Sequence, residues 1–124
     1  MIKDITMKEI TEGLPNPDND IHLLMFFGSN CGPCKATMPH YEAVAKFYTE
    51  KQSRIKFYRI NAWEPVEQAT FCSTKLGVNG VPTFRAYCKS TQFSEKVGGG
   101  DEEILKKYIN GLIDDVFNKF GERI

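Results

Sequence analysis

A short apolar run followed directly by two closely spaced cysteines is the feature that most constrains this chain. The run Ile21–Phe27 is almost unbroken and is bounded by turn residues, which is typical of a strand buried on both faces of a sheet. Residues 28–30 (Gly-Ser-Asn) end the run, and apolar residues at helical spacing then predict a helix over 32–51. Cys31 and Cys34 therefore stand where a buried strand passes into the first turn of a helix.

Shorter segments fill the rest of the chain. Thr6 and Glu9 form a capping-box pattern for a first helix that ends near residues 13–15, before a loop over 15–20. Asp101 can cap a final helix, and we expect the apolar stripe of that helix to face the core. The stripe comprises Ile104, Leu105, Tyr108, Ile109, Leu112, Ile113, Val116, Phe117 and Phe120. The other expected elements are strands over 54–60, 83–88 and 92–97 and a helix over 64–76 that Gly77 closes.

This order of elements predicts an α/β fold with a central mixed sheet of four to five strands flanked by about four helices. Its first βαβ unit should be right-handed. The chain has 124 residues, of which 41% are hydrophobic, so we expect one domain over 1–124 with a full core. This composition excludes a disordered or low-complexity chain.

Charge and terminal sequence limit the partners and the compartment. The 16 basic and 16 acidic residues cancel, which gives no electrostatic reason to expect nucleic acid or an anionic membrane as partner. The N-terminus lacks the pattern of a secretory signal, and no apolar run is long enough to cross a membrane. We therefore expect a cytoplasmic monomer, in a reducing compartment where cysteines seldom form structural disulfides.

The segment Cys31-Gly32-Pro33-Cys34-Lys35 carries the chemistry. The first turn of a helix offers unpaired N–H groups and the positive end of the helix dipole, both of which stabilise a thiolate. Cys31 comes first and is expected to be nearer the solvent, so it is the candidate nucleophile. Cys34 is expected to be the shielded thiol that resolves a mixed disulfide. Pro33 fits there because the first helical turn needs no N–H from it. The predicted reaction is a two-electron dithiol–disulfide exchange without a cofactor.

Two other interpretations of the cysteines are weaker. A structural zinc site usually needs four ligands, and the other candidates (Cys72, Cys88, His22 and His40) form no second closely spaced pair. We therefore expect no metal. An inert structural disulfide is disfavoured by the expected reducing compartment, whereas a CxxC beside a βαβ pattern is typical of a redox motif.

Taken together, these motifs resemble those of the thioredoxin family over residues 21–120. The segment 31–35 matches the active-site motif of that family, and residues 77–84 (Gly-Val-Asn-Gly-Val-Pro-Thr-Phe) resemble its cis-proline segment. Pro39 matches the proline inside the active-site helix, and residues 97–99 resemble the glycine turn after the last strand. Arg59 stands where the family usually has a lysine. The resemblance implies a thioredoxin fold.

The resemblance also implies a substrate site. Pro82 would be cis and would face the cysteine pair, and the backbone of Val81 would hydrogen-bond to an extended substrate peptide. Gly80 and Gly98 would leave room for that peptide. Gly32 and Pro33 complete the substrate-binding set, with Asn30, Lys35 and Arg59 as auxiliary residues.

Three positions depart from the family pattern. The tryptophan that precedes the first cysteine in the family is Asn30 here, which removes a flat apolar contact for partners. The buried aspartate beneath the second cysteine corresponds to Met25, so water or the Cys31 thiolate would have to assist Cys34. Arg85 falls in an expected apolar strand, where it either reaches the sheet edge or pairs with an acid.

The remaining cysteines, the histidines and the tryptophan are expected to have structural roles. Cys72 and Cys88 are expected to be small buried side chains rather than regulatory thiols. His22 is expected at a strand end and His40 on a helix surface. Trp63 is expected to pack near the active-site helix, with a substrate-binding role as the alternative.

The resemblance implies a general protein-disulfide reductase that serves electron transport and redox homeostasis. Its partners would be protein disulfides and an NADPH-linked thioredoxin reductase. One alternative is a glutaredoxin-like, glutathione-dependent enzyme, suggested by the Gly-Gly-Gly-Asp at 98–101, although the spacing from Pro82 to Gly98 suits the longer thioredoxin hairpin. Another alternative is a binding subunit of a larger enzyme that uses the fold without its chemistry.

Overall fold

A five-stranded mixed sheet forms the centre of the computed structural model, which describes residues 1–11 and 19–121. The strands are β1 (Ile2–Asp4), β2 (Ile21–Phe27), β3 (Ile55–Asn61), β4 (Thr83–Cys88) and β5 (Thr91–Val97), in the spatial order β1-β3-β2-β4-β5. β1 and β2 run parallel to β3, whereas β4 runs antiparallel to both β2 and β5. The predicted mixed sheet is confirmed, with β2 at its centre.

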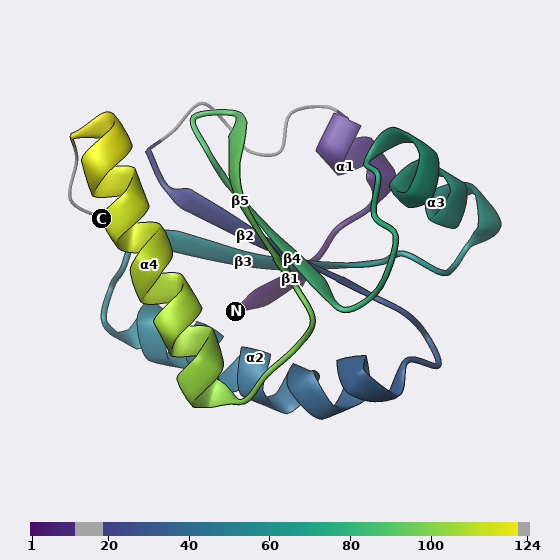
Figure 1. The fold of residues 1–124 in the computed structure, drawn as a ribbon, viewed down its shortest axis with the longest axis horizontal. Helices are drawn as coiled ribbons and strands as arrows, with labels where there is room; N and C mark the ends of the chain where they lie inside the picture. The colour runs from purple at the N-terminus through teal and green to yellow at the C-terminus, as the bar shows by residue number, and fades with distance from the viewer. Residues whose placement is uncertain (12–18, 122–124) are drawn as a thin grey trace.

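Helices cover both sides of this sheet (Figure 1). α2 (Gly32–Glu50) and α4 (Glu102–Phe120) pack together on one side, and α1 (Met7–Thr11) and α3 (Val66–Thr70) lie on the other. Within the described part of the chain, no helix has the length and apolar character that crossing a membrane requires.

The two faces of β2 explain its unbroken apolar sequence. Ile21, Leu23 and Met25 belong to the core that β2 shares with α2 and α4. Leu24 and Phe26 point the other way, into a second core with residues of β3 and the α3 side. Because successive side chains of a strand alternate between faces, a strand buried on both faces is apolar at nearly every position. The polar exception, His22, is buried with its Nδ1 2.7 Å from the hydroxyl of Tyr58.

The N-terminal segment holds one confirmed prediction and one missed element. The N–H of Thr6 donates to Oε1 of Glu9 at 3.2 Å, and the N–H of Glu9 donates to Oγ1 of Thr6 at 3.5 Å, which is the predicted capping box. The end of this helix near residues 13–15 and most of the loop over 15–20 lie outside the described residues. β1 was not predicted, because a three-residue, half-exposed strand has no apolar run to mark it.

The prediction of one continuous helix over 64–76 is wrong. Pro65 is extended and precedes the first turn of α3, which ends at Thr70. The chain then continues as one π-helical turn, η1 (Phe71–Lys75). Gly77, with φ of 66°, ends the segment as expected, since this left-handed backbone suits a residue without a Cβ.

The final helix is capped as predicted but buries a narrower face than expected. Oδ1 of Asp101 accepts the N–H of Ile104 at 2.9 Å. Ile104 and Phe117 are exposed, because they flank the single stripe that a surface helix can turn toward its sheet. The fully buried residues of that stripe are Leu105, Ile109, Leu112 and Val116.

Candidate active site

Cys31 is the N-cap residue of α2. Its backbone is extended, with φ of −91° and ψ of 110°, and its N–H donates to the carbonyl of Gly28 at 3.4 Å. Its own carbonyl accepts the N–H of Lys35 at 3.0 Å, the first hydrogen bond of the helix. Pro33 lies in the first turn, where its missing N–H leaves no intrahelical bond unmade.

The sulfur of Cys31 acts as the helix cap. Cys31 and Cys34 form a disulfide with their Cα atoms 5.2 Å apart, and the N–H of Cys34 donates to Sγ of Cys31 at 3.1 Å. Serine, threonine, aspartate and asparagine usually place an oxygen at this position. A sulfur there meets both a donor and the positive end of the helix dipole, so its thiolate is stabilised once the disulfide is reduced.

The two cysteines differ less in exposure than expected. Cys31 is 4% exposed and Cys34 is 2% exposed, so the predicted order holds, but both thiols are buried in this oxidised structure. Both lie in the same apolar cluster as the fully buried Met25. The residues exposed around them are Asn30, Gly32, Pro33 and Lys35. What distinguishes Cys31 is therefore its hydrogen bonding.

The cis-proline segment lies against Cys31. The Val81–Pro82 peptide bond is cis, as predicted, and the carbonyl oxygen of Val81 is 3.7 Å from Sγ of Cys31. The carbonyl of Pro82 accepts the N–H of Gly98 at 2.9 Å. Tertiary structure thus brings together Cys31, Val81, Pro82 and Gly98, which the sequence separates widely.

The two predicted glycines face open space. A Cβ built at Gly80 or at Gly98 would meet no atom within 4 Å. Gly98 has φ of 93°, a backbone conformation that favours glycine. Oγ1 of Thr83 donates to the carbonyl of Gly80 at 2.7 Å and holds the turn that precedes the cis bond.

Sequence reasoning missed the residues that hold the glycine turn. Nζ of Lys96 donates to the carbonyls of Gly98 and Gly99 at 2.9 Å and 2.8 Å, and burial lowers the pKa of Lys96. On the helix side, Oγ1 of Thr37 accepts the N–H of Gly100 at 3.3 Å. A Cβ at Gly99 would collide with Thr37, so the glycine run allows the turn to approach α2. The run of three glycines was the sequence feature that could have indicated this close approach.

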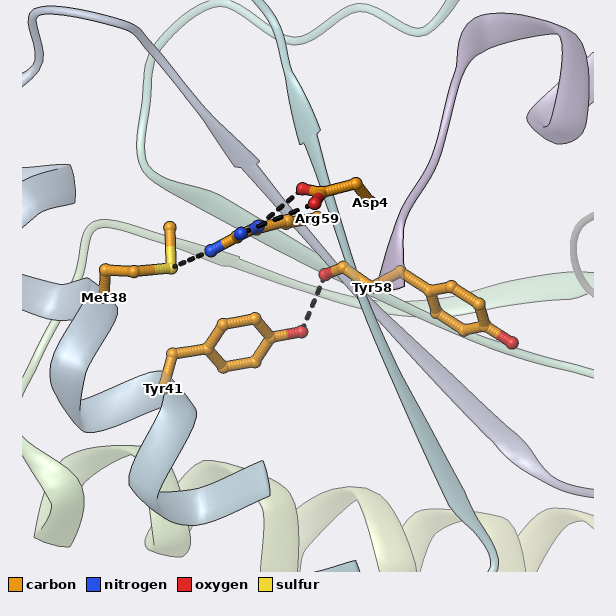
Figure 2. A network of polar contacts seen from close by, with 5 residues as sticks. All are labelled: Asp4, Met38, Tyr41, Tyr58 and Arg59. Atoms are coloured by element: carbon orange, nitrogen blue, oxygen red, sulfur yellow. Dashed lines mark hydrogen bonds and ion pairs between the residues drawn. The ribbon is translucent and has the colours of Figure 1, made fainter. Parts of the chain in front are cut away.

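Arg59 is bound by Asp4 and Met38, as Figure 2 shows. Its Nε donates to Oδ1 of Asp4 at 2.6 Å and its Nη1 to Sδ of Met38 at 3.5 Å. The hydrogen bond to Asp4 raises the pKa of Arg59. Asp4 and Arg59 are also paired in register between β1 and β3. Arg59 therefore joins the edge strand to α2 through Asp4 and Met38.

The remaining candidates have structural partners. Arg85 pairs with an acid, since its Nε donates to Oε2 of Glu95 at 2.8 Å, and its Nη1 donates to the carbonyl of Leu76. Cys72 and Cys88 are buried as expected, and burial raises the pKa of the Cys72 thiol. Among the described residues, no group of three or more metal-ligating side chains lies together.

Comparison with known proteins agrees with this geometry. The family model described as thioredoxin matches residues 2–111. The chain belongs to the thioredoxin family. The match favours the thioredoxin interpretation over the glutaredoxin-like one, and the cysteine pair of this thioredoxin-family chain is that of a disulfide oxidoreductase.

Similar proteins come from several organisms. Thioredoxin 1 of Plasmodium falciparum is 25% identical over 111 residues, which cover 87% of this chain and 98% of that protein. Thioredoxin of Ovis aries is 29% identical over 114 residues, covering 91% and 100%. Human protein disulfide-isomerase A4 is 30% identical over 90 residues, which cover 73% of this chain but only 13% of that longer protein.

Solved structures support the thioredoxin fold. Malassezia sympodialis thioredoxin (Mala s 13) superposes with a TM-score of 0.71 at 19% identity, covering 90% of each chain. The long form of spinach chloroplast thioredoxin f also gives a TM-score of 0.71, at 23% identity, covering 88% of this chain and 84% of that one.

Proposed function

We propose that this chain is a protein-disulfide reductase in which Cys31 is the nucleophile and Cys34 the resolving thiol. The observation that carries the proposal is the position of one sulfur. Sγ of Cys31 accepts the N–H of Cys34 at the start of α2 and lies 3.7 Å from the carbonyl of Val81. The same atom is thus stabilised as a thiolate and placed beside a backbone segment that can hold a peptide.

In the first step, the Cys31 thiolate of the reduced protein attacks one sulfur of a target disulfide. A mixed disulfide forms between Cys31 and the target, and the other target sulfur leaves as a thiolate that takes a proton from solvent. The exposed Gly32 and Pro33 leave the approach to Cys31 unobstructed by large side chains.

In the second step, Cys34 loses its proton and attacks Sγ of Cys31. The internal disulfide forms, the mixed disulfide breaks, and the second target sulfur leaves as a thiolate. The two electrons of the dithiol have then passed to the target. Met25 provides no acid–base group beneath the pair, so solvent or the departing thiolate receives the Cys34 proton.

The substrate would bind as an extended segment along the cis-proline turn. Val81 offers its backbone for strand-like hydrogen bonds, and the open space at Gly80 and Gly98 admits a second backbone. Asn30 and Lys35, both exposed beside the cysteines, would contact the target as auxiliary residues. Arg59 would act only indirectly, by fixing α2 through Met38.

Electron supply completes the proposal. No cofactor is needed, because the cysteine pair itself stores the two electrons, and an NADPH-linked thioredoxin reductase would return the protein to the dithiol. Family membership supports disulfide substrates and this type of reductase. Cytoplasmic location and a monomeric state stay predictions from the sequence.

The test is turnover of insulin disulfides with NADPH and a thioredoxin reductase, beside an assay coupled to glutathione and glutathione reductase. We expect turnover with the thioredoxin reductase, none for Cys31→Ser, and an accumulated mixed disulfide for Cys34→Ser. Cys72→Ala is the matched control, because it removes a cysteine on the other side of the sheet and should retain turnover.

Three outcomes would contradict the proposal. Retained turnover in Cys31→Ser would show that the roles are assigned wrongly. Turnover with glutathione alone would favour the glutaredoxin-like alternative. A cellular function that survives the replacement of both Cys31 and Cys34 by serine would favour the binding subunit.

A further inference from the structure

A groove of about 550 Å³ begins at the cis-proline turn. Gly80 and Val81 form one part of its lining, Trp63 forms another, and residues of α3 and η1 complete it. The carbonyl of Val81 is also the atom that lies 3.7 Å from Sγ of Cys31. Val81 therefore contributes both to the lining of the groove and to the surroundings of the proposed nucleophile.

Trp63 lies against the loop that carries Cys31. A Cβ built at Gly28 would collide with the indole ring, so the ring packs on the bare backbone of that residue. The carbonyl of Gly28 accepts the N–H of Cys31. Trp63 is nevertheless 48% exposed, which leaves part of the aromatic surface free beside the nucleophile.

Hydrogen bonds fix the loop that presents this ring. Oδ1 of Asn61 accepts the N–H of Trp63 at 2.9 Å and that of Glu64 at 3.1 Å. Nδ2 of Asn61 donates to Oγ of Ser29 at 2.8 Å, and the Ser29 hydroxyl donates to Glu64. Ser29 stands two residues before Cys31, so these hydrogen bonds connect the loop that carries Trp63 to the loop that carries the nucleophile.

The lining of the groove is uncharged. Apart from Trp63, the described residues that line it are small, apolar or neutral polar, such as Ala69, Ser73, Val78 and Asn79. A charged side chain placed there would lose hydration without gaining an ionic partner. A large apolar side chain would instead bury surface against the indole.

We propose that Trp63 is a specificity-determining residue, which selects target disulfides whose attacked cysteine is flanked by a large, uncharged apolar side chain. The inference rests on the proposed reductase function. It also accounts for Asn30, which stands where the family has a tryptophan. Trp63, in the loop after β3, would supply the aromatic contact that Asn30 lacks.

The test compares peptide disulfides of equal length in which the residue beside the attacked cysteine is leucine, glycine or aspartate. We expect the leucine peptide to be reduced with the highest kcat/KM and the aspartate peptide with the lowest. Trp63→Ala should lower kcat/KM for the leucine peptide about fivefold to tenfold, mainly through KM. Trp63→Phe, which keeps an aromatic ring, should retain most of the preference.

Two controls separate this inference from the proposed function. Val66→Ala removes an exposed apolar side chain near the same loop that does not line the groove, and it should leave the peptide preference unchanged. With a small disulfide without a peptide, 5,5′-dithiobis(2-nitrobenzoate), Val66→Ala should react as wild type does, and Trp63→Ala should lose less rate than it loses with the leucine peptide. If wild-type protein reduces no disulfide at all, the reductase proposal fails; if it reduces all three peptides equally, only the role of Trp63 fails.

Fluorescence gives an independent measurement, since Trp63 is the single tryptophan of the chain. When Cys34→Ser is trapped as a mixed disulfide with the leucine peptide, the emission should shift to shorter wavelength as the indole loses water. The glycine peptide should produce a smaller shift. Identical spectra for the two trapped complexes would overturn the proposed contact.

Discussion

The N–H of Cys34 donates to the sulfur of Cys31 at 3.1 Å, in the position where a capping side chain normally accepts a helix N–H. This contact links the start of α2 to the reactivity of one thiol. In the reduced protein the same donor and the helix dipole would favour the thiolate of Cys31 over its neutral form.

The thiol of Cys31 should therefore titrate below the value of free cysteine, about 8.5. The rate of alkylation of the reduced protein by iodoacetamide, followed against pH, gives the midpoint. Cys34→Ser is the matched control, because it keeps the backbone donor and should keep the low midpoint. A midpoint at or above that of free cysteine would show that the cap does not activate the sulfur.

Replacing Met25 by aspartate should accelerate the resolving step near neutral pH. Met25 is fully buried in the same cluster as both cysteines, and burial raises the pKa of a carboxyl toward the range where it serves as a base. The free energy of unfolding should fall by about 3 kcal/mol, because the new group is desolvated and smaller than methionine.

Rapid-mixing kinetics of mixed-disulfide resolution measures the rate, and urea unfolding measures the stability. Met25→Leu is the control for this variant, since a swap of similar volume costs less than about 1.5 kcal/mol and adds no base. Equal resolving rates in Met25→Asp and Met25→Leu would mean that Cys34 needs no base at this position.

Glu95→Gln should destabilise the fold more than the loss of an exposed ion pair. The Arg85 side chain is 9% exposed while Glu95 is 40% exposed, so the variant leaves a buried cation without its anionic partner. Gln keeps an acceptor for Arg85 but removes the negative charge, so we expect a loss of about 1–2 kcal/mol, below the cost of breaking a fully buried pair.

Lys56→Gln is the corresponding control. Lys56 faces Asp20 at 4.0 Å with its side chain 59% exposed, and removing such a pair should cost less than about 0.5 kcal/mol. Urea unfolding of both variants provides the comparison. Equal losses would mean that the burial of Arg85 has no energetic consequence.

The protein should lose stability as pH rises above about 10, the ordinary pKa of tyrosine. Burial raises the pKa of Tyr41 strongly. Its hydroxyl donates to the carbonyl of Leu23 and to that of Tyr58 (Figure 2). The folded state thus keeps a proton that the unfolded state releases, so unfolding becomes more favourable with rising pH. The expected slope from this residue is about 1.4 kcal/mol per pH unit.

Tyr41→Phe isolates this contribution. The variant should be less stable at neutral pH, because two carbonyls lose a donor, yet its stability should fall less steeply between pH 10 and 11. Urea unfolding monitored by circular dichroism at several pH values measures both effects. An unchanged slope would assign the alkaline sensitivity to other buried groups such as Tyr87 and Tyr108, whose pKa values burial also raises.

Local elements were predictable because their signals lie within a few residues. The apolar run of β2, the capping box at Thr6 and the cap of α4 at Asp101 all depend on neighbours three or four positions away. The division of this helix into α3 and η1 was not predictable from neighbouring residues, because no local pattern indicates a π-helical turn between Thr70 and Leu76.

The position of the cysteine pair at the start of a helix was determined by the sequence itself, since the apolar run over 21–27 and the spacing of Cys31 and Cys34 place both cysteines at a strand–helix junction. Tertiary structure decided three contacts between distant segments: the carbonyl of Val81 lies near Sγ of Cys31, the indole of Trp63 packs on Gly28, and Arg59 pairs with Asp4. These contacts join residues 35 to 55 positions apart, and they depend on strand order and register. No periodicity within a single segment encodes them, because the free energy that selects them comes from packing the whole sheet.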